Sequence, residues 1–255
     1  MNIVGHYELK RYLNEFKENS EAYKRGGAKI PNINMNVTPG NGQSVIGEFV
    51  TFFLSDNRLR TFHGIDEMIE YSLDGSLKNL QYVFEDIDSK AVYTNEYEGV
   101  VVIDYSALAE YTNEYQVDYF VEKLERVSKN ATLILYYDDG LGRPIEYIKE
   151  RVIKCVGRCI DISVLPYTIK EYSQMVIDNI ADRGISVEES RSIEEIVSKI
   201  ITSSSIETAK EAITIADNLV LLADYSGFVP HLDSKMLKNY YGKETKCIRR
   251  NKNEK

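Results

Sequence analysis

A short segment of the chain has the residue types of a phosphate-binding turn. The sequence enters it from a run with alternating apolar side chains at 34–37 and leaves it into a hydrophobic run at 45–54. A strand, a glycine-rich turn and a helix in this order can place backbone N–H groups and a helix N-terminus around an anion. The candidate phosphate-binding residues are Thr38, Pro39, Gly40, Asn41, Gly42, Gln43 and Ser44.

A carboxylate that could complete such a site follows the most strand-like run in the chain, VVVID at 100–104. Asp104 ends this run, and Ser44 supplies a hydroxyl group. Together these oxygen atoms could hold Mg²⁺ beside a bound phosphate. We therefore expect Asp104 to lie near Ser44.

The residue that would neutralise the phosphate is missing from the turn. The usual pattern is G-x-x-x-x-G-K-[ST], and here Val37 stands for the first glycine and Gln43 for the lysine. A charge-assisted hydrogen bond contributes roughly 1.5–3 kcal/mol, against about 1 kcal/mol for a neutral one. Binding of ATP and Mg²⁺ is therefore expected to be weaker by one or more orders of magnitude, or absent.

The elements that position these residues alternate between strand and helix patterns. Four consecutive β-branched residues at 100–103 predict a strand buried on both faces, as in the centre of a parallel sheet. We expect this strand beside the one at 35–37, and a second buried strand at 131–137. Strands separated by helices of 10–15 residues indicate a doubly wound α/β fold. The other expected elements are helices at 7–21, 45–54, 66–72, 76–88, 118–127 and 145–154, and strands at 59–62 and 158–164.

The chain has only helical patterns from Thr168 onward. Thr168 and Glu171 form a capping box before a helix at 169–183, which Gly184 ends. Further helices are predicted at 190–202 and 206–225. We expect three parts, which are an α/β nucleotide-binding-type domain at 1–165, a small helical domain at 166–245, and a basic, disordered tail at 246–255.

Composition limits the classes of partner and compartment. The formal net charge of −9 disfavours a broad nucleic-acid surface, because Lys and Arg drive phosphate binding there. No apolar run approaches the roughly 18–20 residues that span a bilayer, and no signal peptide is visible. Three cysteines in 255 residues indicate a reducing compartment, so we expect a cytoplasmic protein. We interpret Cys155 and Cys159 as packing residues, and His6, His63 and His231 as too far apart in sequence to suggest a catalytic set.

With these segments in place, the chain resembles an AAA+ ATPase module, in particular the branch with the red-type Rubisco activases and stage V sporulation protein K. The similar segments are IVGHYELK at 3–10, VTPGNGQS at 37–44, VVVID at 100–104, LILYYDD at 133–139 and YTIKEY at 167–172. The resemblance implies a P-loop parallel sheet with a helical lid domain, and ATP with Mg²⁺ as ligands. It also places Arg158 at the position of an arginine finger, and Lys210 nearest to that of a lid sensor.

The positions that differ from the family pattern are those that bind nucleotide or catalyse hydrolysis in the family. Tyr105 stands where the family has the glutamate that polarises water, and loss of such a base costs about 10²–10⁴-fold in rate. The strand at 131–137 ends in Tyr136 and Tyr137, so the sensor asparagine is missing as well. Together with Gln43, these changes predict that ATP hydrolysis is absent or very slow.

These observations lead to the hypothesis of a degenerate AAA+ module, a pseudo-ATPase that acts as an assembly or protein-interaction subunit. It is expected to form a homo-oligomer or to join a mixed ring with an active AAA+ relative, without membrane or nucleic acid. The tyrosines at 105, 111, 115 and 119 are expected to form a protein-contact surface. One alternative is an active or weakly active ATPase that remodels a protein partner. Another is a nucleic-acid-associated AAA+ subunit.

Overall fold

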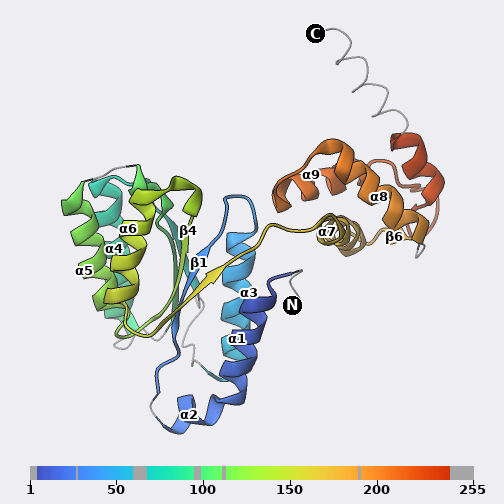
Figure 1. Ribbon diagram of the computed structural model, residues 1–255. Coiled ribbons are helices and arrows are strands. Elements are labelled where there is room, and N and C mark those ends of the chain that lie inside the picture. The colour runs from blue at the N-terminus through green and yellow to red at the C-terminus, as the bar shows by residue number, and fades with distance from the viewer. Residues whose placement is uncertain are drawn as a thin grey trace, which may run out of the picture. The chain divides into compact units, whose positions relative to one another are not determined.

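The structure, a computed structural model, describes residues 5–26, 28–59, 68–94, 99–110, 113–188 and 191–241. The chain divides into two compact units (Figure 1). The first, the α/β unit, comprises Met1–Pro39 and Gln43–Val164, and the second, the helical unit, comprises Gly40–Gly42 and Leu165–Lys255. The basic tail at 246–255 lies outside the described residues.

A five-stranded parallel sheet organises the α/β unit. Its strands are β1 (Asn32–Asn36), β2 (Met68–Ser72), β3 (Val100–Asp104), β4 (Thr132–Tyr137) and β5 (Cys159–Ser163). They lie in the order β2-β3-β4-β1-β5, and every pairing is parallel. All strands therefore end at one edge of the sheet, which we call the carboxyl edge, and begin at the opposite, amino edge. The predicted α/β parallel-sheet fold is confirmed.

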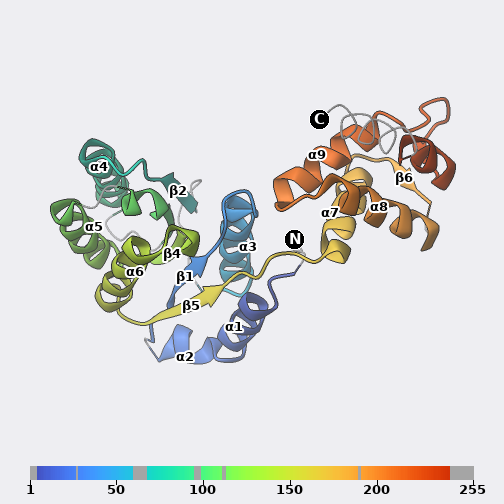
Figure 2. The ribbon, with the colours of Figure 1, turned by 45° about the horizontal axis from the view of Figure 1, so that its top comes forward.

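Helices cover both faces of this sheet, as Figure 2 shows. On one face, α4 (Leu77–Thr94), α5 (Glu114–Val127) and α6 (Arg143–Cys155) pack on β3 residues such as Val101 and Ile103. On the other face, α1 (Tyr7–Glu18) and α3 (Gln43–Asp56) pack on Val100 and Val102. Alternate side chains of β3 thus enter two cores, which is why its sequence shows no polar alternation. The short elements α2 (Ser20–Arg25), η1 (Ser106–Ala109) and η2 (Asp139–Leu141) complete the described part of this unit.

Two predictions about the sheet were wrong. The segment at 66–72 was expected to be a helix, but Met68–Ser72 is strand β2, which pairs with β3 from Met68↔Val100 onward. The strand at 100–103 was expected beside the strand at 35–37, but β4 lies between them. All six residues of β4 are buried, so β4 is itself a central strand. The strand expected at 59–62 falls outside the described residues from position 60 on.

The helical unit is built on α7 (Ile169–Asp182), α8 (Arg191–Ser204) and α9 (Ala209–Val220), with a helical segment at 234–241. A two-residue parallel pair joins β6 (Ser186–Val187) to β7 (His231–Leu232). The predicted capping box of Thr168 and Glu171 is confirmed, and Gly184, at φ +76°, follows the end of α7. In the described part of the chain, no helix has the length and apolar character needed to cross a membrane.

Candidate functional site

The side chain in the lysine position lies at the carboxyl edge of the sheet. Gln43 is the first residue of α3, and Asp104 is the last residue of β3. The Gln43 Nε2 atom donates a hydrogen bond to Asp104 Oδ2 at 3.1 Å. The structure therefore brings together the turn and the carboxylate that the sequence singled out, with a direct contact between them.

The second oxygen of Asp104 is also hydrogen-bonded. Asp104 Oδ1 accepts from the Ser106 backbone N–H at 2.9 Å and from Ser106 Oγ at 2.7 Å. This turn at the end of β3 fixes the orientation of the half-buried carboxylate. Both oxygens of the carboxylate are thus engaged by protein donors.

The hydroxyl group that would bind a metal has a protein partner as well. Ser44 Oγ donates to Glu70 Oε1 at 2.8 Å, and Glu70 lies on β2. Glu70 was not predicted as a site residue, because residues 66–72 were expected to form a helix. The only strand signal in the sequence there is the short alternation of apolar and polar residues in IEYS, which is weak over four residues.

A buried tyrosine fixes the start of α3. Tyr136 on β4 is 1% exposed, and its hydroxyl donates to the Gln43 carbonyl oxygen at 2.7 Å. Burial raises the pKa of Tyr136 well above its ordinary value, so the hydroxyl keeps its proton and remains a donor. The end of β4 therefore carries a structural hydrogen bond to the first residue of α3.

The residue after Asp104 is enclosed in the core. Tyr105 is 0% exposed, its ring stacks on Tyr137 with centroids 5.9 Å apart, and its hydroxyl donates to Asn34 Oδ1 at 3.1 Å. Burial raises the pKa of this hydroxyl far above its ordinary value. A neutral, buried phenol cannot act as the base that the family's glutamate provides.

This burial corrects the prediction of a tyrosine contact surface that includes Tyr105. Of the other members, Tyr115 is 61% exposed on α5, whereas Tyr119 is half-buried against the core. Tyr111 lies outside the described residues. The exposure of Tyr115 follows from its place on α5, because Val117 and Phe120 face the core and Tyr115 lies on the outer side of the helix.

The tip of the glycine turn belongs to the helical unit. Asn41 is 6% exposed, and its Oδ1 accepts from the Ala209 backbone N–H at 3.1 Å. The Gly40 carbonyl oxygen accepts from the Lys210 backbone N–H at 3.0 Å. The exposed Lys210, predicted as the nearest candidate for a lid sensor, thus contacts the tip through its main chain. Thr38 and Pro39 are exposed in the α/β unit.

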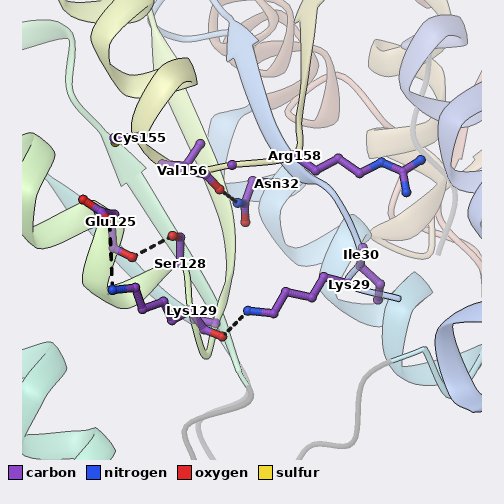
Figure 3. A pocket seen from close by; sticks show the side chains of 11 residues that line it. Lys29, Ile30, Asn32, Glu125, Ser128, Lys129, Cys155, Val156 and Arg158 are labelled. Atoms are coloured by element: carbon purple, nitrogen blue, oxygen red, sulfur yellow. Dashed lines mark hydrogen bonds and ion pairs between the residues drawn. The ribbon is translucent and has the colours of Figure 1, made fainter. Parts of the chain in front are cut away.

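Arg158 lies at the amino edge of the sheet, just before β5. It lines a pocket of about 240 Å³ that also contains Lys29, Glu125 and Lys129. Its side chain extends away from Glu125 (Figure 3), and within the described residues its guanidinium has no ion-pair partner. The nearby Asp161 forms an ion pair with Lys149 at 3.8 Å. Arg158 and Asp104 lie at opposite edges of the sheet of the α/β unit.

The cysteines near this edge are packing residues, as predicted. Cys155 and Cys159 pack against the core formed with α4, α5 and α6. Burial raises the pKa of Cys155 to about 11 and that of Cys159 to about 12, so both are protonated thiols near neutral pH. Among the described residues, no group of three His, Cys, Asp or Glu side chains could hold a metal ion. His63 and Cys247 lie outside those residues.

The carboxyl-edge residues do not fit Mg–ATP in the manner that the family resemblance implies. No cationic side chain stands at position 43, the Asp104 carboxylate accepts three protein hydrogen bonds, and the Ser44 proton is donated to Glu70. A metal or phosphate group would have to displace these bonds.

Comparison with solved structures identifies proteins with a similar fold. A variant of RuvB from Thermotoga maritima is 15% identical, with a TM-score of 0.57 over 93% of this chain and 68% of that chain. A katanin structure described as a structural basis for self-assembly is 14% identical, with a TM-score of 0.55 over 94% and 82% of the two chains. At this level of identity the likeness concerns the fold, and the chain shares the AAA+-type fold of these two structures. No protein-family model matches the sequence, and no curated protein matches it.

Proposed function

We propose that this AAA+-type chain is a pseudo-ATPase that serves as an assembly or protein-interaction subunit, with weak or no binding of nucleotide. One observation carries the proposal, namely the hydrogen bond between Gln43 Nε2 and Asp104 Oδ2. It joins the side chain at the lysine position to the carboxylate that would hold the metal. The chain itself thereby satisfies the two groups that would otherwise act on a bound phosphate.

ATP would lose the contact with a lysine and would have to break hydrogen bonds within the protein. Replacing a charge-assisted contact by a neutral one weakens binding by roughly 1 kcal/mol or more. Displacing Gln43 from the half-buried Asp104 opposes binding further, since such a bond contributes about 1 kcal/mol. Displacing Ser44 from Glu70 adds a smaller cost, because that bond is exposed. We therefore expect a dissociation constant of about 10⁻⁴ M or weaker for ATP with Mg²⁺.

Tyr105 affects hydrolysis independently of nucleotide binding. Its phenol is buried and hydrogen-bonded to Asn34, so no base faces solvent at that position. Even a bound nucleotide would lack about 10²–10⁴-fold of the rate that a positioned base supplies. A phosphate-release assay on the purified chain is expected to show no turnover above background. Turnover at a rate typical of active AAA+ enzymes would contradict the proposal.

The assembly role is supported by two residues that face outward from the α/β unit. The Arg158 guanidinium is exposed, and an arginine needs only position and charge to complete a neighbour's phosphate site. Tyr115 supplies an exposed, amphipathic ring of the kind that is enriched in protein interfaces. A homo-oligomer, or a mixed ring with an active relative, would use either residue.

Two variants distinguish these uses. If Arg158 acts in trans, Arg158→Ala should abolish the ATPase activity of a competent partner and leave the assembled mass unchanged in sedimentation. If the contact is purely structural, Tyr115→Ala should reduce the assembled mass, and Arg158→Ala should have little effect. Lys129→Ala, at the same pocket as Arg158, is the matched control for loss of a surface cation. A chain that stays monomeric at high concentration, with no effect of either variant on any partner, would contradict the assembly role.

The geometry is also compatible with the alternative of an active or weakly active ATPase that remodels a protein partner. Ser44 follows Gln43 at the start of α3, so its hydroxyl and the Asp104 carboxylate remain at the same edge of the sheet. Measurable ATP-dependent phosphate release that is lost in Asp104→Ala would favour this alternative. A nucleic-acid-associated role has less support, because the net charge is −9.

A further inference from the structure

The first turn of α9 has a hydrogen-bond partner for each of its free backbone donors. A helix leaves its first N–H groups without partners inside the helix. In α9, the two backbone donors of the capping box are the Glu211 N–H, which donates to Thr208 Oγ1, and the Thr208 N–H, which donates to Glu211 Oε2. The two remaining donors, of Ala209 and Lys210, are taken by Asn41 Oδ1 and the Gly40 carbonyl. The glycine turn therefore completes the cap of α9.

Helix α7 of the same unit provides a direct comparison. It begins with an equivalent capping box, in which the Glu171 N–H donates to Thr168 Oγ1 and the Thr168 N–H donates to Glu171 Oε2. Within the described part of the chain, the N–H groups of Ile169 and Lys170 have no corresponding partner. The two helices thus share the same local cap, and only α9 receives the additional acceptors from the turn.

The residues of the turn are suited to this contact. Gly40 and Gly42 have φ values of +88° and +83°, which side-chain-bearing residues rarely adopt. A Cβ atom on Gly40 would also lie 3.3 Å from Thr208 Cβ, so the glycine permits the close approach to the N-cap residue. The hydroxyl of Tyr167 donates to the Asn41 carbonyl at 3.3 Å and holds the tip from the other side.

We propose that the Gly40–Gly42 tip is an internal ligand for the N-terminus of α9 and that it excludes anions from that helix end. Oxygen acceptors of the tip occupy the donors that a phosphate oxygen would otherwise use at a helix N-terminus. The glycine turn thereby serves as a helix cap. This inference deepens the proposed function, since it gives a role to a turn that does not hold phosphate. Its test is nevertheless independent of nucleotide affinity.

Residue-resolved amide hydrogen exchange on the full chain tests the cap. After correction for intrinsic rates, the Ala209 and Lys210 amides should exchange more slowly than the Ile169 and Lys170 amides of α7, which serve as the internal control. In Asn41→Ala, exchange at Ala209 should accelerate about fivefold, the factor that corresponds to the roughly 1 kcal/mol contributed by a helix cap. Exchange at Ile169 should not change. Unaltered exchange at Ala209 in a folded Asn41→Ala variant would overturn the proposal.

A milder variant keeps the test decisive if Asn41→Ala does not fold. Tyr167→Phe removes only the hydroxyl that holds the Asn41 carbonyl. Exchange at both Ala209 and Lys210 should accelerate by a factor of about two to three, because a single neutral hydrogen bond at the 0.5 kcal/mol end of its range is lost. No acceleration at either amide would count against the cap.

Inorganic phosphate separates this proposal from the proposed function. Millimolar phosphate should leave exchange at Ala209 and Lys210 unchanged in the wild type, and should slow exchange at Ala209 in Asn41→Ala. Slower exchange at both amides in the wild type would show that an anion displaces the tip, and would overturn the internal-ligand proposal. Tight binding of ATP with no change at these two amides would instead contradict the proposed function and leave the cap intact.

Discussion

The two edges of the parallel sheet differ in whether their polar side chains are bonded within the protein. At the carboxyl edge, Gln43 donates to Asp104, and Ser44 donates to Glu70. At the amino edge, Arg158 extends into solvent without an ion-pair partner among the described residues (Figure 3). The candidate phosphate-site side chains at the carboxyl edge are therefore bonded to one another or to Glu70, whereas Arg158 at the amino edge presents an exposed charge.

This difference indicates which edge of the sheet is open to a ligand or partner. In open α/β sheets, ligands usually bind outside the carboxyl ends of the strands. In this chain, the protein's own side chains occupy the hydrogen-bonding groups at that edge. At the amino edge, the exposed Arg158 guanidinium is available to another molecule, which is consistent with the proposed role in contacts between subunits.

The largest expected effect comes from restoring the family's acidic residue at the carboxyl edge. Tyr105→Glu would bury a carboxylate, remove the ring that stacks on Tyr137, and leave Asn34 without its hydroxyl partner. We expect a loss of about 3–5 kcal/mol in the free energy of unfolding, measured by urea denaturation. Tyr105→Phe, the matched control, keeps the ring and should lose about 1–3 kcal/mol. Wild-type stability of Tyr105→Glu would break the comparison between the edges.

Asp104→Ala removes the acceptor on which the carboxyl edge depends. Gln43 and Ser106 would lose their side-chain partner, so we expect a loss of about 1–2 kcal/mol in the free energy of unfolding. Glu70→Ala, which removes an exposed acceptor from Ser44, should cost less than about 0.5 kcal/mol. Equal losses of stability in Asp104→Ala and Glu70→Ala would show that Asp104 contributes no more to this edge than an exposed carboxylate does.

Arg158→Ala should leave the stability of the chain within about 0.5 kcal/mol of the wild type, because its exposed guanidinium has no ion-pair partner among the described residues. The same denaturation experiment measures this effect. A loss of more than about 1 kcal/mol would show that the arginine stabilises the subunit itself, and would remove the contrast with Asp104.

The smallest expected effect is chemical. Cys155 and Cys159 should react slowly with iodoacetamide near neutral pH, because burial raises their pKa values to about 11 and about 12 and the thiolate is the nucleophile. Alkylation followed by mass spectrometry in a Cys247→Ser background should show the rate rising as the pH approaches 11. Fast alkylation of both thiols at neutral pH would mean that the amino edge opens readily.

The sequence predicted the parts of the fold that local patterns determine. The buried runs at 100–103 and 131–137 are strands, and the capping box at Thr168 lies where the pattern placed it. The order of the strands was not predicted correctly, because β4 lies between β3 and β1. The pairings of β4 with β1 join residues more than 90 positions apart in sequence, such as Ile33↔Ile134. Local periodicity carries no information about such partners.

The sequence singled out Gln43 and Asp104 as candidate site residues but gave no sign of the hydrogen bond between them. Gln43 and Asp104 were identified from spacing, whereas their direct contact depends on side-chain geometry that spacing does not contain. Glu70 was missed because a five-residue strand with one fully buried side chain gives a weak periodic signal. The cap of α9 by Asn41 joins residues 168 positions apart, so the sequence offered no sign of it.

Calorimetric titration of the purified chain with ATP and Mg²⁺ tests the central claim most directly, namely that the carboxyl edge is satisfied by its own side chains. For the wild type, we expect a dissociation constant of about 10⁻⁴ M or weaker. Gln43→Lys should strengthen binding about tenfold, since a charge-assisted contact exceeds a neutral one by roughly 1–1.5 kcal/mol. Micromolar binding by the wild type, unaffected by Gln43→Lys, would contradict the account.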